Sequence, residues 1–325
     1  MIRSIRRSGI VTYAHYTSML AGNDGFVVIT PATYFPGQGR NTGSTQINKM
    51  PHSTETFSTL SATLTFASVS IAAFNSRVNA YALASGASTN KFSIQTDTNA
   101  TFSNTNTTIY TNGVGQISNA KGIYNTNTGT SVGGIVLYIW EYATDTTSTS
   151  TALQSYSGTI GIASMFALNT DGPNVYFGGG VPAGAYVYGG FVKYASDTQT
   201  PSLTFSDSNS RSRAQTPGAN NGSTAGYLAG GIKMPYTTIT SDIMKLTYSN
   251  ETLSTLSGTL TTIRDFVFTG IQHGVCAYYG GGRNSGSSLA TSLTTVEKFT
   301  FATETSANLA SASVNRDGYN SWNTL

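Results

Sequence analysis

The chain has 325 residues, of which 10% are charged and 11% are aromatic, and its formal net charge is +3. Ordinary globular proteins contain about 25% charged residues; here Gly, Ser, Thr and Asn take their place. This composition argues against disorder, the small charge argues against nucleic-acid binding, and the single cysteine, Cys276, excludes an intramolecular disulfide. Short apolar runs predict no transmembrane helix, and Ser/Thr-rich segments between Gly-rich turns predict an all-β protein.

Residues 1–23 fit no repeat and contain three arginines but no acidic residue. The segment is too polar for the core of a signal peptide, and no small-x-small cleavage site follows it. A frayed terminus is one interpretation. We favour a docking arm that lies on a partner protein, since the segment also carries aromatic and apolar side chains. The predicted partner-binding residues of the arm are Arg3, Arg6, Arg7, Tyr13, Tyr16, Met19 and Leu20.

From residue 24 onward a short turn with an acidic residue recurs six times, usually as an aromatic residue, two further residues and then Asp-Thr or Glu-Thr. The acids are separated by 42, 48, 52, 54 and 53 positions. A period near 50 residues is typical of repeat proteins, including propeller blades. The predicted turn acids are Glu55, Asp97, Asp145, Asp197, Glu251 and Glu304.

Each repeat has a common order of features. A strand ends in an aromatic residue and glycines, as in residues 278–282, and a second strand carries a lysine such as Lys298 shortly before the turn. The glycines allow positive φ and close backbone approach. We expect the turn acid to accept N–H groups of its own turn, and the lysine to extend its head into water.

A glycine doublet after an aromatic strand, with aromatic-x-x-Asp/Glu-Thr some 20 residues later, resembles the kelch repeat. The resemblance covers about 300 residues and is clearest in the last three units, but the tryptophan that usually follows the kelch turn is missing. It implies four-stranded blades in a closed β-propeller. The low-charge, Thr/Ser/Asn-rich style also resembles repeats of tailed-bacteriophage virion proteins, although this likeness is less specific.

The two ends of the repeat region are each incomplete. Too few residues precede Tyr34 for two full strands of the first unit, and the final segment, residues 318–325, has no unit of its own to open. We therefore predict a six-bladed propeller over residues 24–325, in which the C-terminal strand closes the first blade and removes a free sheet edge.

No catalytic constellation emerges from the sequence. The histidines, His15, His52 and His273, lack metal-ligand spacing, and His52 occupies a position that is aromatic in later units. A copper-radical site built on Cys276 and Tyr278 is disfavoured, because residues two apart share one strand face, and Cys276 fits a small buried residue. The repeated acids differ from the single pair of a glycosidase. Arg264 and Arg316 are repeat-equivalent and fit structural roles.

These features predict a non-enzymatic structural or adhesive component of a phage virion, without cofactor or metal. It would dock on other virion proteins through its arm, be oligomeric within an assembly and insert in no membrane. One alternative is a carbohydrate-binding host-recognition module that uses polar loops at residues 39–45, 182–188 and 283–288. A propeller enzyme of oxidase or glycosidase type is a further alternative, which would require ligands or acids to converge in space.

Overall fold

The structure of the chain is a computed structural model. It describes residues 32–36, 44–68, 71–76, 78–84, 89–102, 114–116, 121–127, 135–151, 153, 163–169, 173–181, 190–205, 218–233, 238–265, 268–272, 274–284, 293–309 and 322–323. The predicted docking arm, residues 1–23, lies outside this part of the chain. Of the three candidate loops, only residues 44–45 and 283–284 are described.

Every regular element in the described ranges is a β-strand, which confirms the all-β prediction. The strands form four-stranded antiparallel sheets that we number first to sixth in chain order, and β18 (Ile232–Lys233) and β19 (Thr238–Ile239) form a small additional hairpin. The first sheet contains β26 (Trp322–Asn323), β1 (Ala32–Pro36), β2 (Ser44–Pro51) and β3 (Ser58–Ser68); the second, β4 (Ile71–Asn75), β5 (Asn79–Ala84), β6 (Thr89–Ser93) and β7 (Thr98–Phe102); the third, β8 (Val114–Gln116), β9 (Lys121–Asn127), β10 (Ile135–Glu141) and β11 (Thr146–Ser150); the fourth, β12 (Ala163–Asn169), β13 (Asn174–Val181), β14 (Phe191–Ala195) and β15 (Thr200–Phe205); the fifth, β16 (Gly218–Asn221), β17 (Ala225–Ala229), β20 (Asp242–Thr247) and β21 (Thr252–Thr259), with β18 (Ile232–Lys233) and β19 (Thr238–Ile239) beside it; and the sixth, β22 (Phe268–Gln272), β23 (Cys276–Gly280), β24 (Val296–Thr300) and β25 (Thr305–Leu309).

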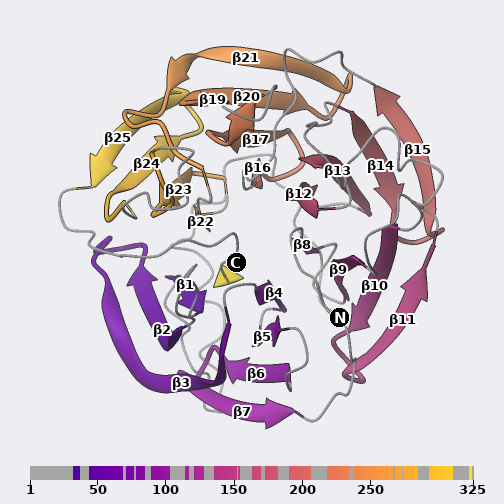
Figure 1. Ribbon diagram of the computed structural model, residues 1–325, viewed down its shortest axis with the longest axis vertical. Helices are drawn as coiled ribbons and strands as arrows, with labels where there is room; N and C mark the ends of the chain where they lie inside the picture. The colour runs from indigo at the N-terminus through magenta and orange to yellow at the C-terminus, as the bar shows by residue number, and fades with distance from the viewer. Residues whose placement is uncertain are drawn as a thin grey trace, which may run out of the picture.

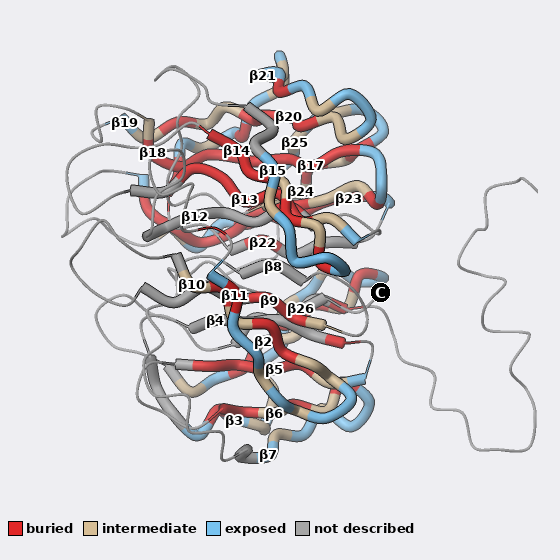
Figure 2. The backbone as a smooth tube through the Cα atoms, turned by 90° about the vertical axis from the view of Figure 1, so that its right-hand side faces the viewer, coloured by how far each residue is buried: buried red, intermediate tan, exposed pale blue. Residues whose placement is uncertain are grey.

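The sheets follow one another around the middle of the molecule (Figure 1). In each sheet the first strand, such as β4 or β16, lies near the middle, and the fourth strand, such as β7 or β21, lies at the periphery. Burial decreases toward the periphery (Figure 2). The second and third strands are mostly buried, whereas the fourth strands carry exposed residues. The described ranges contain no helix that is long and apolar enough to cross a membrane.

The C-terminal strand completes the first sheet, as predicted. β26 pairs antiparallel with β1, with Trp322 opposite Tyr34 and Asn323 opposite Thr33. The first sheet is therefore assembled from both ends of the described chain, and β1 is not left as an open edge.

Each predicted turn connects the third and fourth strands of a sheet. One residue of each turn has a left-handed φ of 53°, which short polar side chains tolerate best. In the fourth sheet this residue is Gln199 and not Asp197, so the predicted turn acid is wrong there. Asp197-Thr198 has the sequence of the motif but lies two positions too early in the turn. Gln199-Thr200 occupies the backbone position that the acid and threonine hold in the other turns. The left-handed residues are Glu55, Asp97, Asp145, Gln199, Glu251 and Glu304.

The predicted role of the glycines after the second strand is confirmed at Gly230. Its φ is +72°, and a Cβ at this position would lie 2.5 Å from the Arg264 carbonyl oxygen. The neighbouring Gly231 N–H donates to that same carbonyl at 2.8 Å. A side chain here would therefore push away the segment that leads from the fifth sheet to the sixth.

Candidate functional site

The boundaries between consecutive sheets carry most of the polar side-chain contacts that the structure describes. In five of the sheets a tyrosine on the second strand lies directly opposite a lysine on the third strand. The pairs are Tyr34 and Lys49, Tyr81 and Lys91, Tyr176 and Lys193, Tyr227 and Lys245, and Tyr278 and Lys298. The lysine always stands six positions before the left-handed turn residue of its own sheet.

Both side chains reach the turn acid of the following sheet. We call each set of tyrosine, lysine and following turn acid a junction triad. The lysine Nζ lies between 2.5 and 2.7 Å from the carboxylate in all five. The acids, in the order of the pairs above, are Asp97, Asp145, Glu251, Glu304 and Glu55. The last of these joins the sixth sheet to the first.

The tyrosine of each junction triad donates its hydroxyl hydrogen to the same carboxylate, at 2.8 Å from Tyr34 to Asp97 and 2.7 Å from Tyr81 to Asp145. Burial raises the pKa of Tyr34 and Tyr81, and the hydrogen bond to the carboxylate raises it further. The phenols therefore remain protonated and act as donors at neutral pH. The lysine ammonium also lies over the tyrosine ring, 5.2 Å from its centroid at Lys49.

Ring stacking accompanies most of the junction triads. Tyr176 stacks on Tyr248 of the next sheet at 5.2 Å, and Tyr227 stacks on Phe301 at 5.1 Å. His52 takes the same place between the sixth and first sheets, with its ring 5.8 Å from that of Tyr278. The prediction that His52 is a packing residue is therefore confirmed.

The geometry corrects two expectations. The turn carboxylates of Asp97 and Asp145 bind the preceding sheet and do not close their own hairpins through the carboxylate, although the Thr residues on either side of each acid pair with one another. The lysine side chains are 20–31% exposed, and their ammonium groups pair with these acids, so the heads do not extend freely into water. The repeat pattern therefore encodes contacts between sheets.

The junction between the third and fourth sheets lacks the tyrosine, the lysine and the acid of a junction triad. Ile123 lies opposite Ile139 at the tyrosine and lysine positions, and Gln199 stands at the position of the acid. Both isoleucines are buried in an apolar cluster with Val175 and Val192. The three replacements are consistent with one another, because a lone ammonium or carboxylate would have no counter-charge there.

A second link runs in the opposite direction, from one sheet back to the one before it. Glu297 of the sixth sheet accepts the backbone N–H groups of Thr261 and Thr262 at 2.6 and 3.2 Å. At the equivalent position of the second sheet, Asn90 accepts the Thr65 N–H at 2.9 Å. A neutral amide and a carboxylate therefore both accept backbone N–H groups of the preceding sheet, each at a different junction.

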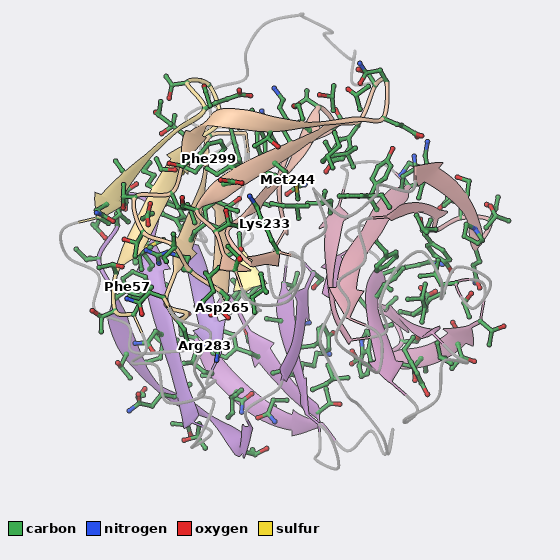
Figure 3. All side chains as sticks on the ribbon, turned by 45° about the horizontal axis from the view of Figure 1, so that its top comes forward. Phe57, Lys233, Met244, Asp265, Arg283 and Phe299 are labelled. Atoms are coloured by element: carbon green, nitrogen blue, oxygen red, sulfur yellow. The ribbon has the colours of Figure 1, made fainter. Side chains whose placement is uncertain are left out.

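Two buried ion pairs reinforce the junction of the fifth and sixth sheets. The Arg264 guanidinium donates to Glu297 at 2.6 Å, and both side chains are 0% exposed. Arg283 binds Asp265 through two nitrogen atoms, at 3.1 and 2.6 Å (Figure 3). The predicted structural role of Arg264 is therefore confirmed, whereas Arg316 lies outside the described residues.

The other sequence candidates are placed as follows. Cys276 is a small buried residue beside Tyr278 and Val296, as predicted. His15, His273 and all seven predicted arm residues lie outside the described ranges. Within those ranges, no three His, Cys, Asp or Glu side chains are grouped so that they could hold a metal ion.

A hollow of about 430 Å³ opens at the junction of the fifth and sixth sheets, over the Lys245–Glu304 pair. The turn between β16 and β17 forms one wall through Asn221 and Thr224, and the turn before β25 forms the other through Thr303. The sequence predicted the turn of the sixth sheet but gave no sign of the hollow, which exists only where two turns from different sheets meet.

Comparison with known proteins leaves the resemblance to kelch repeats a prediction. No protein-family model matches the sequence, and no curated protein matches it.

Proposed function

We propose that the chain is a closed, six-bladed, kelch-like β-propeller that serves as a non-enzymatic structural or adhesive part of a phage virion. In this proposal each four-stranded sheet is one blade, β26 closes the first blade, and residues 1–23 dock on a neighbouring virion protein. The pairing of β26 with β1 and the contact between Lys298 and Glu55 support the ring, because both join the end of the chain to its beginning.

The observation that carries the non-enzymatic role is the use of the charged groups. In five junction triads each acid pairs with a lysine of the preceding sheet, and Arg264 and Arg283 pair with Glu297 and Asp265. A general acid or a nucleophile needs a reactive group directed at a substrate. Here the repeated carboxylates stabilise sheet boundaries, as expected of a scaffold.

The outer strands also suit a particle exposed to solvent. β21 exposes Thr252, Ser254, Thr255, Ser257 and Thr259, and β11 exposes Thr146, Ser148 and Thr149. A hydroxyl-rich, nearly uncharged surface has little attraction for nucleic acid or for acidic membranes.

Cryo-EM of virions purified from a culture that produces the chain tests this function. The expected map places six blades on the particle, with residues 1–23 ordered against another virion protein. A variant without residues 1–23 should fold but be missing from purified particles. A full-length protein that is a free monomer in ultracentrifugation, and that mass spectrometry does not detect in virions, would refute the proposal.

A further inference from the structure

We propose that the hollow between the fifth and sixth sheets is a binding site for a neutral sugar. Its lining is rich in groups that pair with hydroxyls: the Asn221 amide, the Thr224 and Thr303 hydroxyls, and the Lys245 and Glu304 head groups. This inference goes beyond the proposed structural role and does not depend on placement in a virion.

Glu304, like Glu251, takes both of its triad partners on one carboxylate oxygen, whereas the shorter acids use both oxygens. In the triads of Asp97 and Asp145, the tyrosine binds one carboxylate oxygen and the lysine binds the other. In the Glu304 triad, Tyr227 and Lys245 both bind Oε1. Within the described part of the chain Oε2 accepts no hydrogen bond, and it belongs to a residue that lines the hollow. A carboxylate oxygen of this kind accepts hydroxyl hydrogens.

The charges at the base of the hollow select an uncharged ligand. Lys245 and Glu304 form one ion pair, so the site carries no net charge from them. A free anion would meet the carboxylate, and a free cation would meet the ammonium; either would have to displace an existing partner. The hydrogen bond to Glu304 raises the pKa of Lys245, so this pairing persists at neutral pH. A polyol can use the remaining donors and acceptors without breaking the pair.

The walls are held in place before any ligand arrives. In the Asn221–Thr224 turn, the Thr224 N–H and hydroxyl donate to the Asn221 carbonyl at 3.1 and 2.7 Å, and Gly222 has a φ of 55°. In the opposite turn, the Glu304 N–H donates to the Thr300 carbonyl at 2.8 Å. Such a site loses little conformational entropy on binding. Its volume of about 430 Å³ lies in the range of small-molecule sites, about 300–1,000 Å³.

Saturation-transfer NMR on the purified full-length chain tests the site, with glucose, galactose and N-acetylglucosamine at millimolar concentration. Glucosamine and sialic acid serve as charged comparators. We expect signals from at least one neutral sugar and none from the charged ones. Ala302→Trp, which fills the exposed mouth of the hollow, should weaken binding about tenfold or more.

The matched control is Ser249→Trp, the equivalent exposed position one sheet earlier, which should leave binding unchanged. Both variants are compared with the unmodified chain by thermal melting, so that only folded protein is scored. The proposal is overturned if no neutral sugar gives a signal, if charged sugars bind as well as neutral ones, or if folded Ala302→Trp binds as the unmodified chain does.

Discussion

Lys298 and Glu55 lie 243 positions apart in the sequence, and the Lys298 ammonium donates a hydrogen bond to the Glu55 carboxylate. Tyr278 donates to the same oxygen at 2.8 Å. This contact repeats the geometry found between sheets that are adjacent in the chain, such as Tyr176 and Lys193 with Glu251. One recognition rule therefore serves both neighbouring sheets and the contact between the two ends of the repeat region, where the loop-closure entropy is greatest.

His52 should make this end-to-end contact sensitive to acid. Burial lowers the pKa of His52 to about 4, Lys298 lowers it too, and Glu55 opposes the shift. The unfolded chain binds a proton on His52 near pH 6.5 but the folded chain does so only near 4, so stability present above pH 6.5 is lost as the pH falls between these values. The shift corresponds to about 3 kcal/mol at most.

His52→Phe places in the first sheet the residue type that Phe301 supplies in the sixth. We expect the unfolding free energy at pH 7 to change by less than about 1 kcal/mol. Between pH 6.5 and 4 the variant should lose about 2–3 kcal/mol less than the unmodified chain does. Urea denaturation at a series of pH values measures both quantities. Parallel pH curves for the two proteins would contradict the assignment.

Arg264 and Glu297 should respond unequally to mutation, although they form one ion pair. Arg264→Met leaves a carboxylate that is 0% exposed without its counter-charge, which should cost about 3–5 kcal/mol. Glu297→Gln should cost less, because the Arg264 guanidinium keeps its hydrogen bonds to the Gly281 and Thr295 carbonyl oxygens. Asn90 also shows that a neutral amide can hold the preceding sheet at the equivalent position. Denaturation of both variants and of the double mutant measures the difference. Equal losses in the two single variants would show that the pair acts only as a unit.

The Ser/Thr-rich segments between Gly-rich turns were sufficient to predict the all-β class. The incomplete ends of the repeat region were sufficient to predict that the last strand joins the first sheet. The partners of the acids were not predictable, because they lie on another sheet. The lysine six positions before the left-handed turn residue, present in five of the six sheets, was the overlooked signal. When the repeats are aligned on their lysines, Gln199 falls at the position of Glu251 and Glu304, because it stands six positions after Lys193. Asp197 does not fall at that position. The hollow and the buried arginine pairs require side chains from different repeats, which no single repeat specifies.

Removal of residues 318–325 should prevent stable folding. It deletes β26, which occupies the edge of β1, and exposes Tyr34, which is 0% exposed in the complete chain. An open edge at this place would also favour association between molecules. We expect the truncated chain to lose its cooperative thermal transition or to aggregate on expression. The matched control removes residues 324–325, which lie after β26. A chain ending at residue 317 that melts at the unmodified temperature would exclude a closing role for β26.

The apolar junction between the third and fourth sheets permits a direct test of the pairing rule. Ile139 is 1% exposed and occupies the lysine position, so Ile139→Lys should cost about 2–4 kcal/mol through lost burial and an unpaired ammonium. Gln199 is exposed, and Gln199→Glu alone should change stability by less than about 0.5 kcal/mol.

If the junction triads are interchangeable, Ile139→Lys and Gln199→Glu together should recover about 1–3 kcal/mol of the stability that Ile139→Lys alone loses. The converse cycle, Lys91→Ile with Asp145→Gln, is the control at a natural ionic junction. Urea denaturation of each single and double variant gives both coupling energies. Additive effects at the third-to-fourth junction would mean that the turn residue there does not face the lysine position.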